Sequence, residues 1–134
     1  MNQQTYYQKN IMIVDDDPEI VNSLQELLRS HGFHVTTAKH SSHCLYELEK
    51  GFQGIIILDL KMPFITDIGT IKKIMTAGFI DQTTIIVLTT KRIQGEEFDE
   101  IYPYIYEYIT KPLDMNALLN TIKKIAKQPP KKRI

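Results

Sequence analysis

Five short apolar runs, separated by longer segments of helical periodicity, constrain the fold of this chain more than any other feature. Runs such as IIIL and IIVL are rich in β-branched residues and lack apolar–polar alternation, which is typical of parallel strands covered by helices on both faces. Strands and helices that alternate along the chain form successive βα units. The sequence therefore predicts an α/β fold with a doubly wound, five-stranded parallel sheet, whose strands lie at 11–14, 33–37, 54–58, 84–88 and 106–109.

Helix boundaries follow from caps and breakers between these strands. Asp17 followed by Pro18 predicts the start of the first helix, and Gly32 predicts its end. Further helices are predicted at about 41–50, at 68–76, less regularly between 91 and 102, and from 114 onward. The length of 134 residues suits one domain. We expect a disordered tail, the domain, and a basic tail or truncated linker at 1–9, 10–127 and 128–134.

Charge and cysteine content argue against several classes of protein. Basic and acidic residues both number 16, and a net charge of zero argues against direct nucleic-acid binding. The neutrality is a cancellation, because residues 1–111 hold 10 basic and 15 acidic residues and residues 112–134 hold 6 and 1. Cys44 is the only cysteine, so no internal disulfide forms. The chain lacks a secretory signal or an apolar membrane span, so we expect a cytoplasmic protein with no membrane partner.

Polar residues follow four of the predicted strands. They are Asp15 and Asp16 after the first, Asp59 after the third, Thr89 after the fourth and Lys111 after the fifth. Ligands bind beyond the carboxyl ends of strands in an open parallel sheet, so these side chains are candidates for one site. Taken singly, each also has a structural explanation as a solvated helix-start acid, a strand residue or a surface charge.

Three carboxylates at one sheet edge repel one another unless a cation lies between them. Oxygen ligands favour a hard divalent ion, Mg²⁺ above all, with Mn²⁺ as a substitute. A carboxylate nucleophile, a metal, a hydroxyl and an ammonium are together the parts that receive a phosphoryl group.

These residues lie in the segments IMIVDDDPEI, IIILDLKMP, IIVLTT and YITKPLD, and through them the chain resembles the receiver domain of two-component response regulators over about residues 10–127. The resemblance implies a flavodoxin-like sheet with strand order 2-1-3-4-5. It also implies that Asp59 is the phosphoacceptor, served by a sensor histidine kinase or a phosphotransfer protein. The domain would not be an enzyme beyond Mg²⁺-dependent self-phosphorylation and slow autodephosphorylation.

The resemblance also assigns roles around Asp59. Asp16 would bind Mg²⁺ directly, Asp15 through water, and Lys61 through its backbone carbonyl. Thr89 and Lys111 would contact the phosphoryl group, and the bond from Lys111 to Pro112 would be cis.

The resemblance further implies a switch at helix four and strand five. The hydroxyl of Thr89 would move toward the phosphoryl group and vacate space that Tyr108 fills. Lys61 and Lys91, two residues after the phosphoacceptor and after the threonine, would modulate the phosphoryl lifetime, or else are solvated lysines.

A tyrosine pattern and two departures from the family remain. Tyrosines at every second position would lie on one side of a strand, either as half-buried packing or as a docking or homodimer face: Tyr102, Tyr104, Tyr106 and Tyr108. The segment 64–67 replaces the usual Gly-Met-Asp-Gly, and Tyr104-Ile105 replaces a usual Gly-Ala. A short patch on the second helix, His40, His43 and Cys44, is a weak metal-binding pattern remote from the carboxylates.

Three other functions stay open at this point. Asp15 and Asp17 spell Asp-x-Asp after a strand, as in haloacid-dehalogenase-like phosphatases, although Pro18 and the lack of room for a cap domain argue against such an enzyme. A pseudo-receiver would fold alike without being phosphorylated. A flavin module is disfavoured, because three acids at the first loop repel a phosphate.

Overall fold

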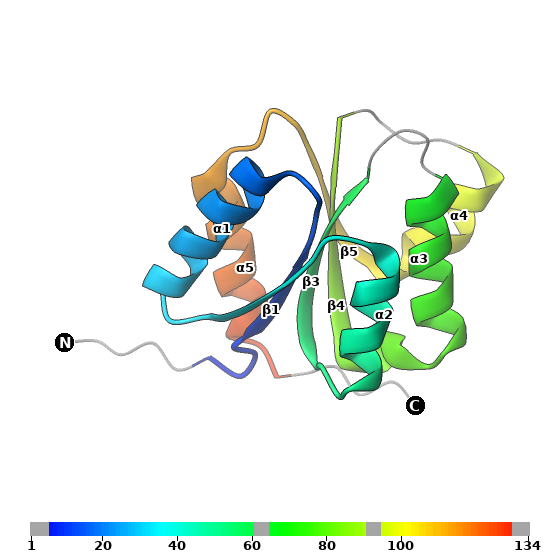
Figure 1. Cartoon of the computed structure of the whole chain (residues 1–134), viewed down its shortest axis with the longest axis horizontal. Helices are drawn as coiled ribbons and strands as arrows, with labels where there is room; N and C mark the ends of the chain where they lie inside the picture. Colours follow the sequence, from blue (N-terminus) through cyan, green and yellow to red (C-terminus); the bar gives the residue numbers. More distant parts are fainter. Residues whose placement is uncertain (1–5, 61–64, 91–94, 130–134) are drawn as a thin grey trace.

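The computed structural model describes residues 6–60, 65–90 and 95–129. The strands are β1 (Asn10–Val14), β2 (His34–Ala38), β3 (Gly54–Leu60), β4 (Thr83–Thr89) and β5 (Ile105–Thr110). The helices are α1 (Pro18–Ser30), α2 (Ser41–Glu49), α3 (Ile65–Thr76), α4 (Glu96–Ile101) and α5 (Met115–Ala126), with 3₁₀ helices η1 (Phe79–Gln82) and η2 (Tyr102–Tyr104). The parallel strands follow the order β2-β1-β3-β4-β5. Helices α1 and α5 cover one face of the sheet and α2, α3 and α4 cover the other (Figure 1), which confirms the predicted fold class.

The buried apolar side chains form two clusters, one on each face of the sheet. The α1/α5 cluster includes Leu24, Leu28, Leu118 and Ile122, and the α2–α4 cluster includes Cys44, Leu48, Ile71 and Ile101. Alternate residues of β1, β3 and β4 divide between the clusters, as the pleat requires. β3 is buried at all seven residues, so its carboxyl end is held in the middle of the sheet.

Two helix starts show how the local sequence sets the positions of the elements. The Asp17 side chain accepts a hydrogen bond of 3.0 Å from the Glu19 N–H, which caps α1 as predicted. Asp114 caps α5 in the same way through the N–H groups of Asn116 and Ala117. Both caps lie at the helix ends of loops that carry site residues, so they fix the point at which each loop enters its helix.

The amino-terminal segment differs from its prediction. Tyr6 is only 8% exposed and stacks on Phe33 with ring centroids 4.7 Å apart. The N–H groups of Tyr7 and Gln8 donate to the carbonyl of Ala126, at the end of α5, at 2.8 and 3.2 Å. The prediction of a disordered tail was therefore wrong for residues 6–9, since this short segment packs without any periodicity that would mark it in the sequence.

The tyrosines of the fifth strand do not share one side, so that prediction was also wrong. Tyr102 and Tyr104 belong to the 3₁₀ helix before β5. Ile85 pairs with Ile105 but Ile86 pairs with Glu107, so β5 contains one extra residue, a β-bulge. The extra residue shifts the phase of the pleat, and successive tyrosines of β5 consequently face different helices.

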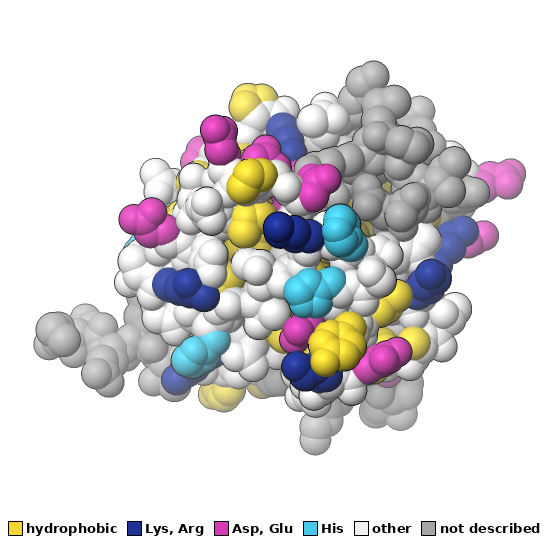
Figure 2. Space-filling model, viewed as in Figure 1, with side chains coloured by type: hydrophobic (Ala, Val, Ile, Leu, Met, Phe, Trp, Pro, Cys, Tyr) yellow, Lys and Arg dark blue, Asp and Glu magenta, His cyan; other side chains and the backbone are white. Residues whose placement is uncertain are grey.

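Charged side chains of both signs are spread over the face that α1, α2 and α3 form, and acidic ones gather along its upper edge near the start of α1 (Figure 2). Within the described ranges, no helix has the length and apolar character needed to cross a membrane.

Candidate functional site

The sheet register brings the predicted site residues to one edge. Val14 pairs with Leu58, so Asp15, which directly follows β1, and Asp59, the next residue of β3, lie beside each other. The following pairings, Leu60 with Thr89 and Thr89 with Thr110, place the end of β4 between the ends of β3 and β5. The chain then continues directly into Lys111. Four residues that are far apart in sequence therefore meet at the carboxyl ends of adjacent strands.

Asp59 and Lys111 form the central contact of this site. Lys111 Nζ lies 2.7 Å from Asp59 Oδ2, and the side chains are 20% and 1% exposed. The Lys111 N–H also donates to the carbonyl of Thr89 at 2.8 Å, which fixes the start of the loop after β5. The peptide bond from Lys111 to Pro112 is cis, as predicted. An ammonium is thus held on a buried carboxylate by the strand geometry itself.

Burial raises the pKa of Asp59 to about 6, and the neighbouring carboxyl of Asp15 adds to the rise. Lys111 acts in the opposite direction but does not cancel the effect. The Asp59 carboxylate is therefore ionised at neutral pH at a cost in free energy, and a second positive charge nearby would lower that cost.

Asp15 and Asp16, although adjacent, occupy different environments. Asp15 is 5% exposed and its Oδ1 accepts a hydrogen bond of 3.0 Å from the Asp17 N–H, whereas Asp16 is exposed. Among the described residues, no group of three acidic, histidine or cysteine side chains is arranged to hold a metal ion. The predicted convergence of three carboxylates is thus seen only for Asp15 and Asp59 in this part of the chain.

The residues present nevertheless fit a divalent cation. Asp59 Oδ1 is buried and has no hydrogen-bond partner among the described residues. It lies beside Asp15, so the donors at this point are carboxylate oxygens, the ligands that Mg²⁺ prefers. A cation here would satisfy a buried anionic oxygen that the described protein atoms leave unsatisfied.

The remaining site predictions divide into two groups. Thr89 is 2% exposed at the end of β4, and Tyr108 is half-buried on β5, with its hydroxyl oxygen buried and without a hydrogen-bond partner among the described residues. Burial, and then the nearby Tyr102, raises the pKa of the Tyr108 hydroxyl above its usual range, so it stays protonated. Lys61, Lys91 and part of the departing segment 64–67 lie outside the described residues.

The histidine and cysteine patch on α2 has an ordinary structural explanation. Cys44 is buried in the α2–α4 cluster, and this burial raises the pKa of its thiol to about 11. The thiolate that would bind a metal is therefore disfavoured. His43 points to Glu47 on the same helix, 3.5 Å away.

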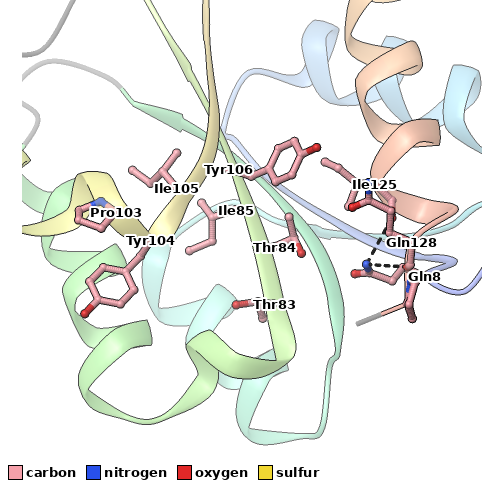
Figure 3. A pocket seen from close by; sticks show the side chains of 11 residues that line it. Gln8, Thr83, Thr84, Ile85, Pro103, Tyr104, Ile105, Tyr106, Ile125 and Gln128 are labelled. Atoms are coloured by element: carbon pink, nitrogen blue, oxygen red, sulfur yellow. Dashed lines mark hydrogen bonds between the residues drawn. The ribbon is translucent and has the colours of Figure 1, made fainter. Parts of the chain in front are cut away.

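A pocket lies at the opposite edge of the sheet, away from Asp59. Its volume is about 80 Å³ and its walls come from the starts of β4 and β5, η2, the amino-terminal segment and the end of α5. Figure 3 shows the Tyr106 side chain pointing toward Ile125 of α5 and the Tyr104 side chain pointing the opposite way. The described residues that line the pocket, which include Gln8, Thr84 and Gln128, carry no charged side chain. The chemistry of the strand ends is therefore separate from this pocket.

The structure so far defines an α/β domain with a buried, ion-paired carboxylate at the carboxyl ends of its strands, and comparison with known proteins gives the family. Residues 11–123 match the family model of the response regulator receiver domain. The chain belongs to this family and is a receiver domain of the phosphorelay type.

Similar proteins agree with this assignment. The transcriptional regulatory protein DltR of Streptococcus agalactiae is 27% identical over 113 residues, which cover 84% of this chain and 50% of that protein. A CheY-like receiver domain from Methanospirillum hungatei JF-1 is 31% identical, with a TM-score of 0.79 and coverage of 87% and 93% of the two chains. The Thermotoga maritima protein TrrA in complex with Mg²⁺ and BeF is 28% identical, with a TM-score of 0.70 and coverage of 88% and 99%. The chain spans about half the length of the first curated relatives that it matches.

One contact at this end of the molecule was not predicted from the sequence. Tyr102 stacks on Tyr108, six residues later in the chain. No sequence signal marks this pair, because the contact depends on the 3₁₀ turn and on the bulge between them.

Proposed function

We propose that residues 10–127 act as a cytoplasmic phosphoacceptor domain in which Asp59 receives a phosphoryl group from a phosphohistidine of a sensor kinase or a phosphotransfer protein. A carboxylate oxygen of Asp59 attacks phosphorus, the N–P bond of the donor breaks, and an acyl phosphate forms on Asp59. The observation that carries this proposal is the buried Asp59 carboxylate held 2.7 Å from the Lys111 ammonium.

Lys111 and Thr89 serve the phosphoryl group after transfer. The Lys111 ammonium, already on Asp59 Oδ2, passes to a phosphoryl oxygen and offsets its charge. Thr89 donates its hydroxyl to another phosphoryl oxygen. The movement of Thr89 leaves space on its face of the sheet that favours an inward position of Tyr108, and partners read this change at α4 and β5.

Mg²⁺, or Mn²⁺ in its place, would be held by Asp15, Asp16, Asp59 and the backbone carbonyl of Lys61. When bound, the cation neutralises charge on the transferring phosphoryl group. The buried Oδ1 of Asp59, which has no hydrogen-bond partner in the described part of the chain, supports this assignment. The Mg²⁺ complex of TrrA supports it for the family in general.

Four further features of the function are proposed with it. Lys61 and Lys91 modulate how long the acyl phosphate survives. Self-phosphorylation from small donors and slow autodephosphorylation are the only chemistry, and direct nucleic-acid binding is not expected. A homodimer through α4 and β5 stays a prediction, which light scattering with and without a phosphoryl mimic tests; a monomer in both states refutes it.

Incubation with a small phosphodonor tests the central proposal. With Mg²⁺, intact-mass spectrometry is expected to show one added phosphoryl group on the wild type, none on Asp59→Asn, and none on either protein with excess EDTA. Labelling of the Asp59→Asn variant at an equal level overturns the assignment of Asp59. Turnover of simple phosphate esters would instead support the phosphatase alternative.

A further inference from the structure

Three aromatic side chains next to the proposed switch contact one another. We call Phe98, Tyr102 and Tyr108 the aromatic triad. Tyr108 lies 5.0 Å from Phe98 between ring centroids, at 56°, and 5.7 Å from Tyr102, nearly parallel at 9°. Phe98 and Tyr102 meet edge to face at 5.7 Å. Each ring therefore touches both others, with centroid distances in the range of attractive aromatic pairs.

Tyr108 points inward in this structure, since its ring packs on the α2–α4 cluster and its hydroxyl oxygen is buried. This inward position depends on the ring contacts, because the hydroxyl gains no hydrogen bond there from the described residues. The hydroxyl oxygen is buried and finds no acceptor or donor among the described residues. Turned toward solvent, the same hydroxyl would bond to water, which disfavours the inward position. The rings of the aromatic triad offset this cost.

Tyr102 differs from the other two members of the aromatic triad because more than half of it is exposed to solvent. Its side chain is 58% exposed, so one face lies on Tyr108 while much of the residue stays in water. The tight η2 turn, closed by the Ile105 N–H to the Tyr102 carbonyl, holds its backbone just before β5. Tyr102 thus contributes less to the core than to the position of the ring it covers.

The position of Tyr108 matters for the phosphoacceptor site because of the strand register. Tyr108 pairs with Val87, and both belong to the side of the sheet that packs on the α2–α4 cluster. Thr89 lies two residues further along β4 and so faces the same side. Tyr108 and Thr89 are therefore neighbours on one face of the sheet.

We propose that Tyr102 is a positioning residue that holds Tyr108 in its inward orientation and thereby favours the phosphorylated conformation of this domain. The second part of this inference, the coupling between Tyr102 and the phosphorylated conformation, rests on the proposed function, in which phosphorylation also favours the inward position of Tyr108. Two effects that favour the same state strengthen each other, so loss of the Tyr102 ring weakens binding of a phosphoryl mimic. The interaction energy of one aromatic pair corresponds to about a fivefold change in the affinity for the phosphoryl mimic.

The test uses the whole chain with ¹³C-labelled tyrosine and phenylalanine rings. In the unliganded protein, Tyr102→Ala is expected to lose the nuclear Overhauser effect between Phe98 and Tyr108 and to average the χ1 coupling of Tyr108. Titration with beryllium fluoride and Mg²⁺ is expected to give about fivefold weaker binding than the wild type. Tyr102→Phe keeps the ring and restores both readouts. Tyr46→Ala, which removes a tyrosine of similar exposure (54%) from α2, matches the wild type in both.

Two results separate the parts of the inference. If Tyr108 keeps its orientation in folded Tyr102→Ala and in Tyr102→Leu, a variant that preserves apolar volume, the positioning role is overturned. If Tyr108 turns outward while beryllium fluoride binds as in the wild type, the coupling is overturned. Failure of the wild type to bind beryllium fluoride counts against the proposed function, whereas the ring orientation still decides the role of Tyr102.

Discussion

Replacing Asp59 with Asn removes a carboxyl group whose ionisation is less favourable in the folded state than in the unfolded state. We therefore expect the variant to be more stable than the wild type at neutral pH. Burial and Asp15 raise the pKa of Asp59 from 3.8 to about 6. A difference of about two pKa units corresponds to about 3 kcal/mol between the folded and unfolded states. An uncharged amide of nearly the same shape avoids this cost, while Lys111, which is 20% exposed, retains access to water.

The sign of the effect follows from proton linkage. Because the folded pKa is higher than the unfolded one, the folded state binds more protons between about pH 4 and 6, and stability falls as the pH rises through that range. The gain from Asp59→Asn should therefore be below about 1 kcal/mol at pH 4 and reach about 3 kcal/mol above pH 7.

Urea denaturation in EDTA at a series of pH values measures this difference. Asp114→Asn is the matched control, because it removes one exposed carboxylate while Asn still caps α5. The control is expected to stay within about 0.5 kcal/mol of the wild type at every pH. A gain that does not change between pH 4 and 7.5, or a loss of stability in Asp59→Asn, would refute the reasoning.

Three other outcomes are expected. Tyr6→Ala should lower the free energy of unfolding by about 3 kcal/mol or more, because Tyr6 is buried against Phe33. Tyr7→Ala, at a residue that is 67% exposed, should change it by less than about 0.5 kcal/mol. Urea denaturation compares the two variants, and equal effects would contradict the packing role of Tyr6. Tyr108→Phe should raise the free energy of unfolding by about 1 kcal/mol, since it removes a buried hydroxyl without a described partner; a lower melting temperature would argue that this hydroxyl is bonded. Adding Mg²⁺ at pH 7.5 should raise the melting temperature of the wild type more than that of Asp59→Asn, and equal shifts would place the cation elsewhere.

The strand ends could be predicted from the sequence because their signals are local. Four of the five apolar runs lead into the polar residues of the predicted site, and Asp17 and Asp114 indicate where the helices that follow them begin. The contact between Asp59 and Lys111 could not be read from periodicity, since it joins residues 52 positions apart and depends on the strand order. Asp15 and Asp16 differ in burial because neighbouring residues at the end of an extended strand point to opposite sides. Asp15 is therefore buried and Asp16 exposed.

The tyrosines of β5 show what one extra residue does to a strand. Alternating residues share a side only while the strand is regular, and the bulge between the pairs formed by Ile105 and Glu107 breaks that rule. Tyr106 consequently lines the pocket beside α5, whereas Tyr108 packs on the α2–α4 cluster. A regular strand would have placed both rings on one face, where they would compete for the space next to α4. The bulge separates them, so Tyr108 is the one tyrosine of β5 on the α4 side, and η2 supplies a second ring, Tyr102, from outside the strand.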